Sequence, residues 1–186
     1  TRWTEQCDRD LYRLVCYVNT TKNYKQISWV GDSSEDLVIE TYVDADFAGC
    51  LRTQRSTTGM TMNMKGPNTN FWLSSLSRRQ DAVSHSTTEA EIVAGEHVIR
   101  VEVIPQLLLW WYLFKRSIIA KIMEDNSAMI KICESGQTQK MRHLLRTHKV
   151  DLAFLIETIR DDPDMQMHYT YTVSYTHLTL PTTGIV

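Results

Sequence analysis

The sequence predicts a mixed α/β domain in which three antiparallel strands come first and helices with further strands follow. Two observations support this fold class. Residues 37–47 alternate between apolar and polar side chains, and two more strand-like segments, residues 57–64 and 70–76, follow after short polar turns. A helical segment that begins at Ser86 then precedes an apolar strand-like run and another helix, an order typical of crossovers between parallel strands.

The first elements are separated by clear turn signals. A short amphipathic helix is expected at residues 5–18, where apolar side chains recur at helical spacing, and the polar stretch 19–23 ends it. The polar residues 52–56 precede the second strand, and Gly-Pro-Asn at 66–68 precedes the third. Short loops of this kind favour an antiparallel meander.

The second half of the chain begins with a capping box. In Ser86-Thr87-Thr88-Glu89, the serine hydroxyl can accept from a free backbone N–H while the glutamate reaches back to the start of the helix. This helix is expected to reach about Ile104, where Pro105 permits a kink or a break. The remaining predicted elements are a buried strand at 118–123, a helix from 125–127 to about 133, a helix at 147–159 and a last strand at 165–173.

Length, charge and composition exclude several classes of protein. The chain has 186 residues, of which 42% are hydrophobic and 23% charged, as expected of a folded globular domain. A net charge of -2 excludes a polycation that wraps nucleic acid, so any such binding must be local. Pro105 interrupts the longest apolar run, residues 103–114, which falls short of the roughly 20 residues of a membrane span. No secretory leader is visible.

The four cysteines lie far apart and form no Cys-x-x-Cys pair. This spacing argues against a zinc site and against a disulfide framework. Free, mostly buried thiols in a reducing compartment are expected instead.

Three acidic residues come from different predicted elements. Asp44 lies in the first strand, where it would either need a cation or lie on the exposed face of an edge strand. Asp125 follows the strand at 118–123, at the kind of strand end where α/β sheets bind ligands, although it could equally cap the next helix. Glu91 lies among small and apolar residues on the helix that begins at Ser86, and so on its sheet-facing side.

Converging carboxylates suit the hydrolysis of phosphodiesters, which uses two metal ions roughly 3.5–4 Å apart. Glu89 is not expected to join them, because the capping box already explains it. It is interpreted as part of a solvated stripe with Glu96 and Arg100, which form an i,i+4 ion pair.

Several motifs occur in a characteristic order and spacing. They are Tyr42-Val43-Asp44-Ala45-Asp46-Phe47-Ala48-Gly49, Arg55-Ser56-Thr57-Thr58-Gly59, Phe71-Trp72, Ser86-Thr87-Thr88-Glu89-Ala90-Glu91, Glu124-Asp125-Asn126-Ser127 and Arg146-Thr147-His148-Lys149-Val150-Asp151. Together they resemble the ribonuclease H domain of copia-class LTR retrotransposon polyproteins. The resemblance covers about residues 37–172, and residues 5–22 resemble the helix that joins the preceding reverse transcriptase to this domain.

The resemblance implies a ribonuclease-H-like fold, a mixed sheet with helices on both faces. It implies an endonuclease that cuts the RNA strand of RNA–DNA hybrids during reverse transcription. Asp44, Glu91 and Asp125 match the family's metal-binding and catalytic acids, which would hold two Mg²⁺ ions, or Mn²⁺. The implied partners are the hybrid and the reverse transcriptase and integrase regions of the same polyprotein, inside the cell in a cytoplasmic virus-like particle or in the nucleus.

The chain also departs from the family pattern. Family members carry a fourth acidic residue after the last strand, in an Ala-Asp-x-x-Thr-Lys-like segment that is not present here, so an incomplete metal set is expected. Asp151 is interpreted as a structural acid rather than as that ligand. Relatives read Lys-His where this chain has His148-Lys149, which leaves the role of His148 open.

The resemblance divides the chain into three parts. These are a remnant of the reverse transcriptase connection at 1–30, the ribonuclease-H-like domain at 37–172, and a tail at 174–186 that holds no Lys, Arg, Asp or Glu and resembles a translated sequencing adapter.

Basic side chains gather in two stretches and could contact the phosphates of a hybrid duplex. The residues expected to bind nucleic acid are Arg55, Arg79, Lys140, Arg142, Arg146 and Lys149. A solvated basic face with no ligand is the alternative explanation of the same residues.

Three functions remain open from the sequence. The first is an active hybrid-cutting ribonuclease, and the second is a truncated or decayed copy that folds and binds nucleic acid but cleaves poorly. The third is an integrase-like nuclease on the same fold, which would prefer DNA ends. A hydrolase triad of Asp81, Ser84 and His85 is disfavoured, because no nucleophile elbow surrounds the serine.

Overall fold

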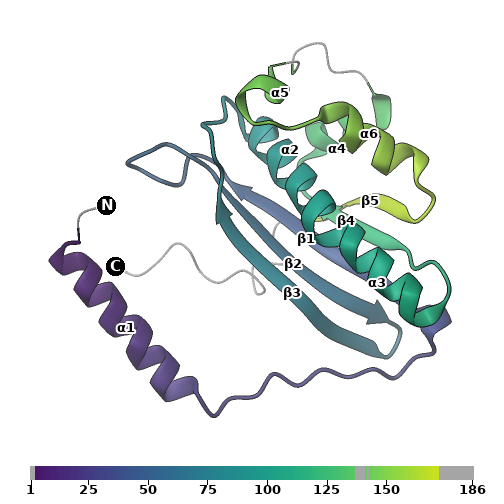
Figure 1. Cartoon of the computed structure of the whole chain (residues 1–186), viewed down its shortest axis with the longest axis horizontal. Coiled ribbons are helices and arrows are strands. Elements are labelled where there is room, and N and C mark those ends of the chain that lie inside the picture. Colours follow the sequence, from purple (N-terminus) through teal and green to yellow (C-terminus); the bar gives the residue numbers. More distant parts are fainter. Residues whose placement is uncertain (1–2, 137–140, 142, 172–186) are drawn as a thin grey trace.

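A computed structural model describes residues 3–136, 141 and 143–171 (Figure 1). The predicted tail at 174–186 lies outside these residues, as do Lys140 and Arg142. The strands are β1 (Val38–Asp46), β2 (Thr57–Gly66), β3 (Thr69–Arg79), β4 (Ala120–Glu124) and β5 (Met165–Tyr169). The helices are α1 (Glu5–Thr21), η1 (Ser34–Asp36), α2 (Thr87–Val98), η2 (Ile99–Val103), α3 (Ile104–Phe114), α4 (Ser127–Ser135), α5 (Leu144–Thr147) and α6 (Leu152–Asp161).

The five strands form one mixed sheet in the order β3-β2-β1-β4-β5. Strands β1, β2 and β3 pair antiparallel, whereas β4 runs parallel to β1 and β5 runs parallel to β4. The predicted sequence of an antiparallel meander followed by parallel strands is therefore confirmed. Because β1 lies at the centre of the sheet, Asp44 is not on an edge strand, and that alternative is removed.

The core lies between the sheet and the helices α2, α4 and α6. Along β1, residues such as Ile39 and Val43 are fully buried, while the residues between them are partly exposed. The three helices contact the sheet and also one another, and Figure 1 shows them on one side of it. Helices were expected on both faces, but within the described residues the packed helices share one face.

The long helical segment after Ser86 does not break at Pro105. A π-helical turn, η2, joins α2 to α3, and the backbone N–H of Ile104 donates to the carbonyl of Ile99. A proline cannot donate to the preceding turn, and its ring crowds the carbonyl four residues earlier. The wider π turn absorbs both effects, so the chain remains helical to Phe114.

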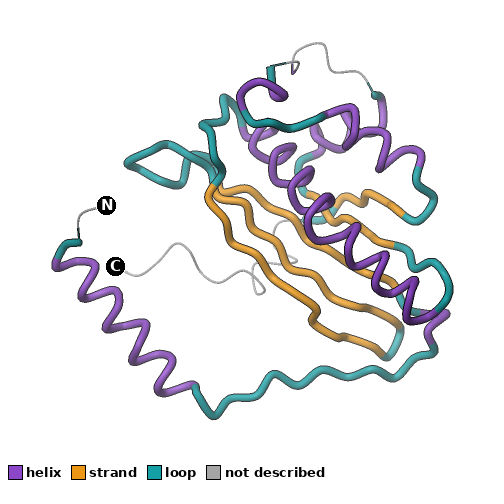
Figure 2. The backbone as a smooth tube through the Cα atoms, viewed as in Figure 1, coloured by secondary structure: helices purple, strands orange, loops and turns teal. Residues whose placement is uncertain are grey.

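Helix α1 lies apart from the sheet (Figure 2). It confirms the predicted helix, but none of its residues is buried, and its apolar side chains such as Leu14 and Val18 are exposed. The extended segment after it reaches the sheet at Trp29, which forms a bridge with Asn70 in β3. In the described part of the chain, no helix combines the length and apolar character needed to span a membrane.

All four cysteines are free, as expected. Cys133 is buried, whereas Cys16 is exposed and Cys7 and Cys50 are half-buried. The expectation that most of the thiols are buried is therefore wrong.

Candidate metal centre

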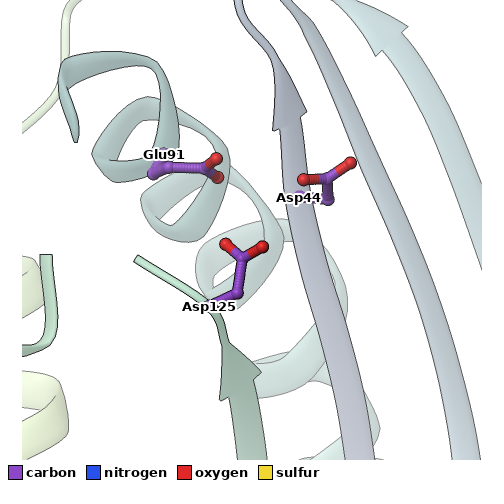
Figure 3. A group of neighbouring side chains, drawn as sticks. All are labelled: Asp44, Glu91 and Asp125. Carbon is purple, nitrogen blue, oxygen red and sulfur yellow. The ribbon is translucent and has the colours of Figure 1, made fainter. Parts of the chain in front are cut away.

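Asp44, Glu91 and Asp125 meet at the end of the central strands (Figure 3). Each offers one carboxylate oxygen, and these three oxygens lie within 4.8 Å of one another. Glu91 is buried and the two aspartates are half-buried. Among the residues that the structure describes, no other His, Cys, Asp or Glu side chains form such a group of three.

The register of the sheet brings the two aspartates together. Strands β1 and β4 run parallel with Tyr42 opposite Met123, so two residues further along Asp44 and Asp125 reach the same edge on the same face. The helix-capping role is taken by the next residue, since the side chain of Asn126 accepts from the backbone N–H groups of Ala128 and Met129. Asp125 is therefore not the cap of α4.

Glu91 reaches the site from the first turns of α2. Ser86 caps this helix by accepting from the backbone N–H of Glu89 at 3.1 Å, which fixes where the helix begins and which side of it carries Glu91. Both neighbours of Glu91, Ala90 and Ile92, are fully buried. The helix is thus held with Glu91 directed at the sheet.

Burial and like charge raise the pKa of these carboxyl groups. The pKa of Glu91 rises to about 10, first because the group is buried and then because Glu124, Asp44 and Asp125 lie near it. Burial likewise raises the pKa of Asp44, with a further contribution from Asp125. The backbone N–H of Ala45 works in the opposite direction and lowers the pKa of both groups.

Glu124 is a further acid beside these three, and the sequence did not single it out as a site residue. Its side chain is fully buried, and Oε1 accepts from the backbone N–H of Asn126 at 2.9 Å. Burial raises its pKa to about 8 against that hydrogen bond, and Asp125 adds to the rise. Glu124 lies two residues after Ile122 and four after Ala120, so it shares their buried face of β4. This period of two was the signal in the sequence that could have identified it.

The donor set fits a hard divalent cation. All three converging groups offer carboxylate oxygens, the ligands that Mg²⁺ and Mn²⁺ prefer. Glu91 Oε2 and Glu124 Oε2 are buried and have no hydrogen-bond partner within the described residues. A cation among these groups would compensate the charge that burial otherwise disfavours.

Asp151 takes a different position. Its side chain accepts from the backbone N–H groups of Ala153 and Phe154 and so caps α6. This contact agrees with its interpretation as a structural acid.

Glu89 does not lie on a solvated stripe, contrary to the sequence-based interpretation. Its side chain is 3% exposed, and its oxygens lie 3.0 Å from His148 Nε2 and 3.4 Å from His143 Nε2. The expected ion pair between Glu96 and Arg100 is present at 2.7 Å, but Glu96 is buried as well. The contacts of Glu89 with two residues more than fifty positions away could not be inferred from helix periodicity.

The four described basic candidates come from two segments of the chain. Arg79 is opposite Thr57, which in turn pairs with Asp46 at the end of β1, and Arg55 lies in the loop that joins β1 to β2. Arg146 and Lys149 are exposed in the segment whose His148 contacts Glu89. Figure 1 shows the loop after β1, the start of α2 and α5 at the same end of the molecule.

No protein-family model matches the chain. Among solved structures, LC11-RNase H1, isolated from compost by a metagenomic approach, is 14% identical with a TM-score of 0.49, over 75% of this chain and 89% of that chain. The prototype foamy virus protease-reverse transcriptase is 13% identical with a TM-score of 0.44, over 85% of this chain. A foamy viral protease-reverse transcriptase in complex with dsDNA is 15% identical with a TM-score of 0.31, over 92% of this chain.

The chain spans 20% and 30% of the two foamy virus chains that it matches. At such identities and TM-scores, the fold class rests on the strand order and strand directions of the chain itself.

The raised pKa values predict that the metal-free protein loses stability as the pH rises. Glu91 and Glu124 have pKa values of about 10 and about 8 in the folded state, whereas an unfolded glutamate has a pKa of about 4.3. Between these values the folded state binds more protons than the unfolded state, so the free energy of unfolding falls with pH. We expect the urea midpoint in EDTA to fall between about pH 5 and about pH 8, and Mn²⁺ to restore it at the higher pH.

The double variant Glu91→Gln, Glu124→Gln serves as the control, because it removes the two groups whose pKa values rise most and should weaken this dependence. A urea midpoint that stays constant or rises with pH in the metal-free wild type would contradict the assignment.

The contact between His148 and Glu89 predicts a stability cost for His148→Ala. The substitution removes the imidazole that lies 3.0 Å from the buried Glu89 Oε1, and a buried carboxylate with no neighbour to compensate its charge costs about 1–3 kcal/mol. His168→Ala is the matched control, because His168 is exposed and its loss should change stability by less than about 0.5 kcal/mol. Equal urea midpoints for the two variants would show that the buried contact contributes nothing.

Proposed function

We propose that this domain is an endonuclease that hydrolyses the RNA strand of RNA–DNA hybrids with two divalent metal ions. The observation that carries the proposal is the convergence of Asp44, Glu91 and Asp125 within 4.8 Å. Carboxylates gathered from two parallel strands and a helix are what a metal-dependent phosphodiesterase requires. We assign all three the role of metal ligands and catalytic residues.

The metal ions, Mg²⁺ or Mn²⁺, would activate a water molecule and stabilise the leaving oxygen of the RNA strand. The chain's own contribution is to hold the carboxylates in place before substrate binds. Asp44 lies on the central strand β1, Asp125 directly follows the paired strand β4, and Glu91 lies on a helix packed against β1, so paired strands and a packed helix hold all three in place.

The substrate assignment draws on the charges that flank the acids. Arg55 and Arg79 lie on the side of the β1–β2 loop, and Arg146 and Lys149 on the side of α5. Basic groups on both sides suit a duplex, because phosphates supply most of the sequence-independent affinity. Selection of a hybrid would depend on backbone shape and 2′-hydroxyl groups. Lys140 and Arg142, outside the described residues, belong to the same proposed surface.

The biological setting follows from the sequence motifs. We assign the domain to a copia-class retrotransposon, in which it would remove the RNA template during reverse transcription. Residues 1–30 would then be the end of a reverse transcriptase connection, and the reverse transcriptase and integrase regions of the same polyprotein would be its partners. The reaction would take place inside the cell, in a virus-like particle or in the nucleus.

A hybrid-cleavage assay tests the function. With Mg²⁺ and an RNA–DNA hybrid labelled on the RNA strand, we expect cleavage of the RNA by the wild type and a loss of about 100-fold or more in Asp44→Asn. The reason is that an amide removes the negative charge that binds the cation.

Asp151→Asn is the matched control, because asparagine also caps a helix and Asp151 lies outside the cluster. It should cleave like the wild type. Equal rates of RNA cleavage for the wild type and Asp44→Asn would refute the proposed nuclease activity. Hybrid binding without cleavage would identify a decayed copy. Stronger binding to blunt DNA ends than to hybrid would favour the integrase-like alternative.

The basic surface predicts a defined salt dependence of binding. In the Asp44→Asn background, Arg79→Ala and Lys149→Ala should each weaken hybrid binding equally for all sequences. Each should also reduce the slope of log K against log salt concentration by about 1. Lys25→Ala, an exposed change in the segment after α1, should leave the slope unchanged. Identical slopes in all of these proteins would mean that the surface is a solvated basic face.

A further inference from the structure

Gln80 is a buried side chain that joins three parts of the domain. It follows β3 directly and is 5% exposed. Its Nε2 donates to Thr58 Oγ1 in β2 at 3.2 Å and to the backbone carbonyl of Ala90 in α2 at 2.9 Å. Its Oε1 accepts from Ser84 Oγ at 3.2 Å. Both N–H donors and the acceptor are therefore satisfied, as a buried amide requires.

The two groups that accept from Gln80 lie next to the acids: one is on the helix that carries Glu91, and the other is on the strand paired with the one that carries Asp44. Ala90 directly precedes Glu91. Thr58 pairs with Ala45 in the sheet, and Ala45 directly follows Asp44. The amide of Gln80 therefore ties the helix that carries Glu91 to the strand pair that carries Asp44.

Gln80 is itself held from the other side. Its backbone N–H donates to the carbonyl of Ser56 at 2.8 Å, and Ser56 Oγ accepts from the backbone N–H of Ala48 in the loop after β1. Ser56, Thr58 and Ser84 are all buried. The network is thus a fixed anchor and not a surface contact that exchanges with water.

We infer that Gln80 is a positioning residue of the metal centre, and this inference rests on the proposed function. Helices slide and tilt against sheets more easily than paired strands move against each other, because a helix is held by side-chain packing. Fixing the carbonyl beside Glu91 to β2 sets the distance between Glu91 and Asp44. Without Gln80, α2 remains folded but Glu91 is free to move away from the aspartates.

Gln80→Leu tests this inference, since leucine is of similar size and makes none of the hydrogen bonds. A misplacement of about 1 Å can cost about 100-fold in rate, so we expect a fall in kcat of that order with KM for the hybrid unchanged within twofold. The Mn²⁺ concentration at half-saturation, measured by calorimetry without nucleic acid, should rise about tenfold.

Ser84→Ala is the matched control, because it removes the contact on the other side of the amide and leaves both donors in place. It should keep kcat and Mn²⁺ affinity within about threefold of the wild type. Thr58→Val removes one acceptor at nearly constant shape and should shift both quantities in the direction of Gln80→Leu. Circular dichroism and thermal unfolding establish that each protein is folded at the assay temperature. If Gln80→Leu does not fold, the kcat and Mn²⁺ affinity of Thr58→Val test the inference in its place.

A folded Gln80→Leu protein with wild-type kcat and Mn²⁺ affinity would overturn the inference. So would an equal loss of kcat and Mn²⁺ affinity in Ser84→Ala, because the network would then act only through general stability. If the wild type does not cleave the hybrid, the proposed function fails by itself, and the Mn²⁺ affinities of the variants still test whether Gln80 positions the acids.

Discussion

The candidate site is defined by the confinement of several carboxylates to a partly buried space at the end of the central strands. Like charges at short range in a medium of low dielectric repel strongly, and burial removes the water that would screen them. The raised pKa values of Asp44, Glu91 and Glu124 express this cost. A fold retains such an arrangement when something else compensates it, and a divalent cation is the compensation that three carboxylates fit best.

Helix α2 connects this charged site with the rest of the domain. Ser86 caps its start, the side chain of Glu89 in its first turn contacts His148, and the carbonyl of Ala90 accepts a hydrogen bond from Gln80. Three independent contacts within the first turn and a half fix the axis and the rotation of the helix. Beyond that region the helix continues through a π turn before Pro105.

The sequence predicted what depends on local periodicity and failed where distant residues meet. Alternation along β1, the crossover pattern and the capping box were sufficient to nominate Asp44, Asp125 and Glu91, because each follows from its own element. Glu124 was missed although its parity on β4 was readable, since the apolar run was taken to end one residue earlier. The capping box of Ser86 and Glu89 is confirmed, since the backbone N–H of His85 donates to Glu89 Oε2. The burial of Glu89 was missed because the histidines that cover it come from a segment more than fifty residues away. Gln80 lies between the predicted strand at 70–76 and the helix that begins at Ser86, where no periodicity indicates which way its side chain points.

Folding and catalysis place opposite demands on this site. The core is apolar and formed by residues such as Ile39, Ile122 and Leu155. Replacing an acid by its amide removes repulsion and burial cost, so the loss of these carboxylates is expected to leave the fold intact or to make it more stable. A copy that has lost its chemistry would therefore look like an active one in every measurement of folding. Only the affinity for a divalent ion and the cleavage of a hybrid report on the carboxylates themselves, which is why the function of this domain has to be decided by those two measurements.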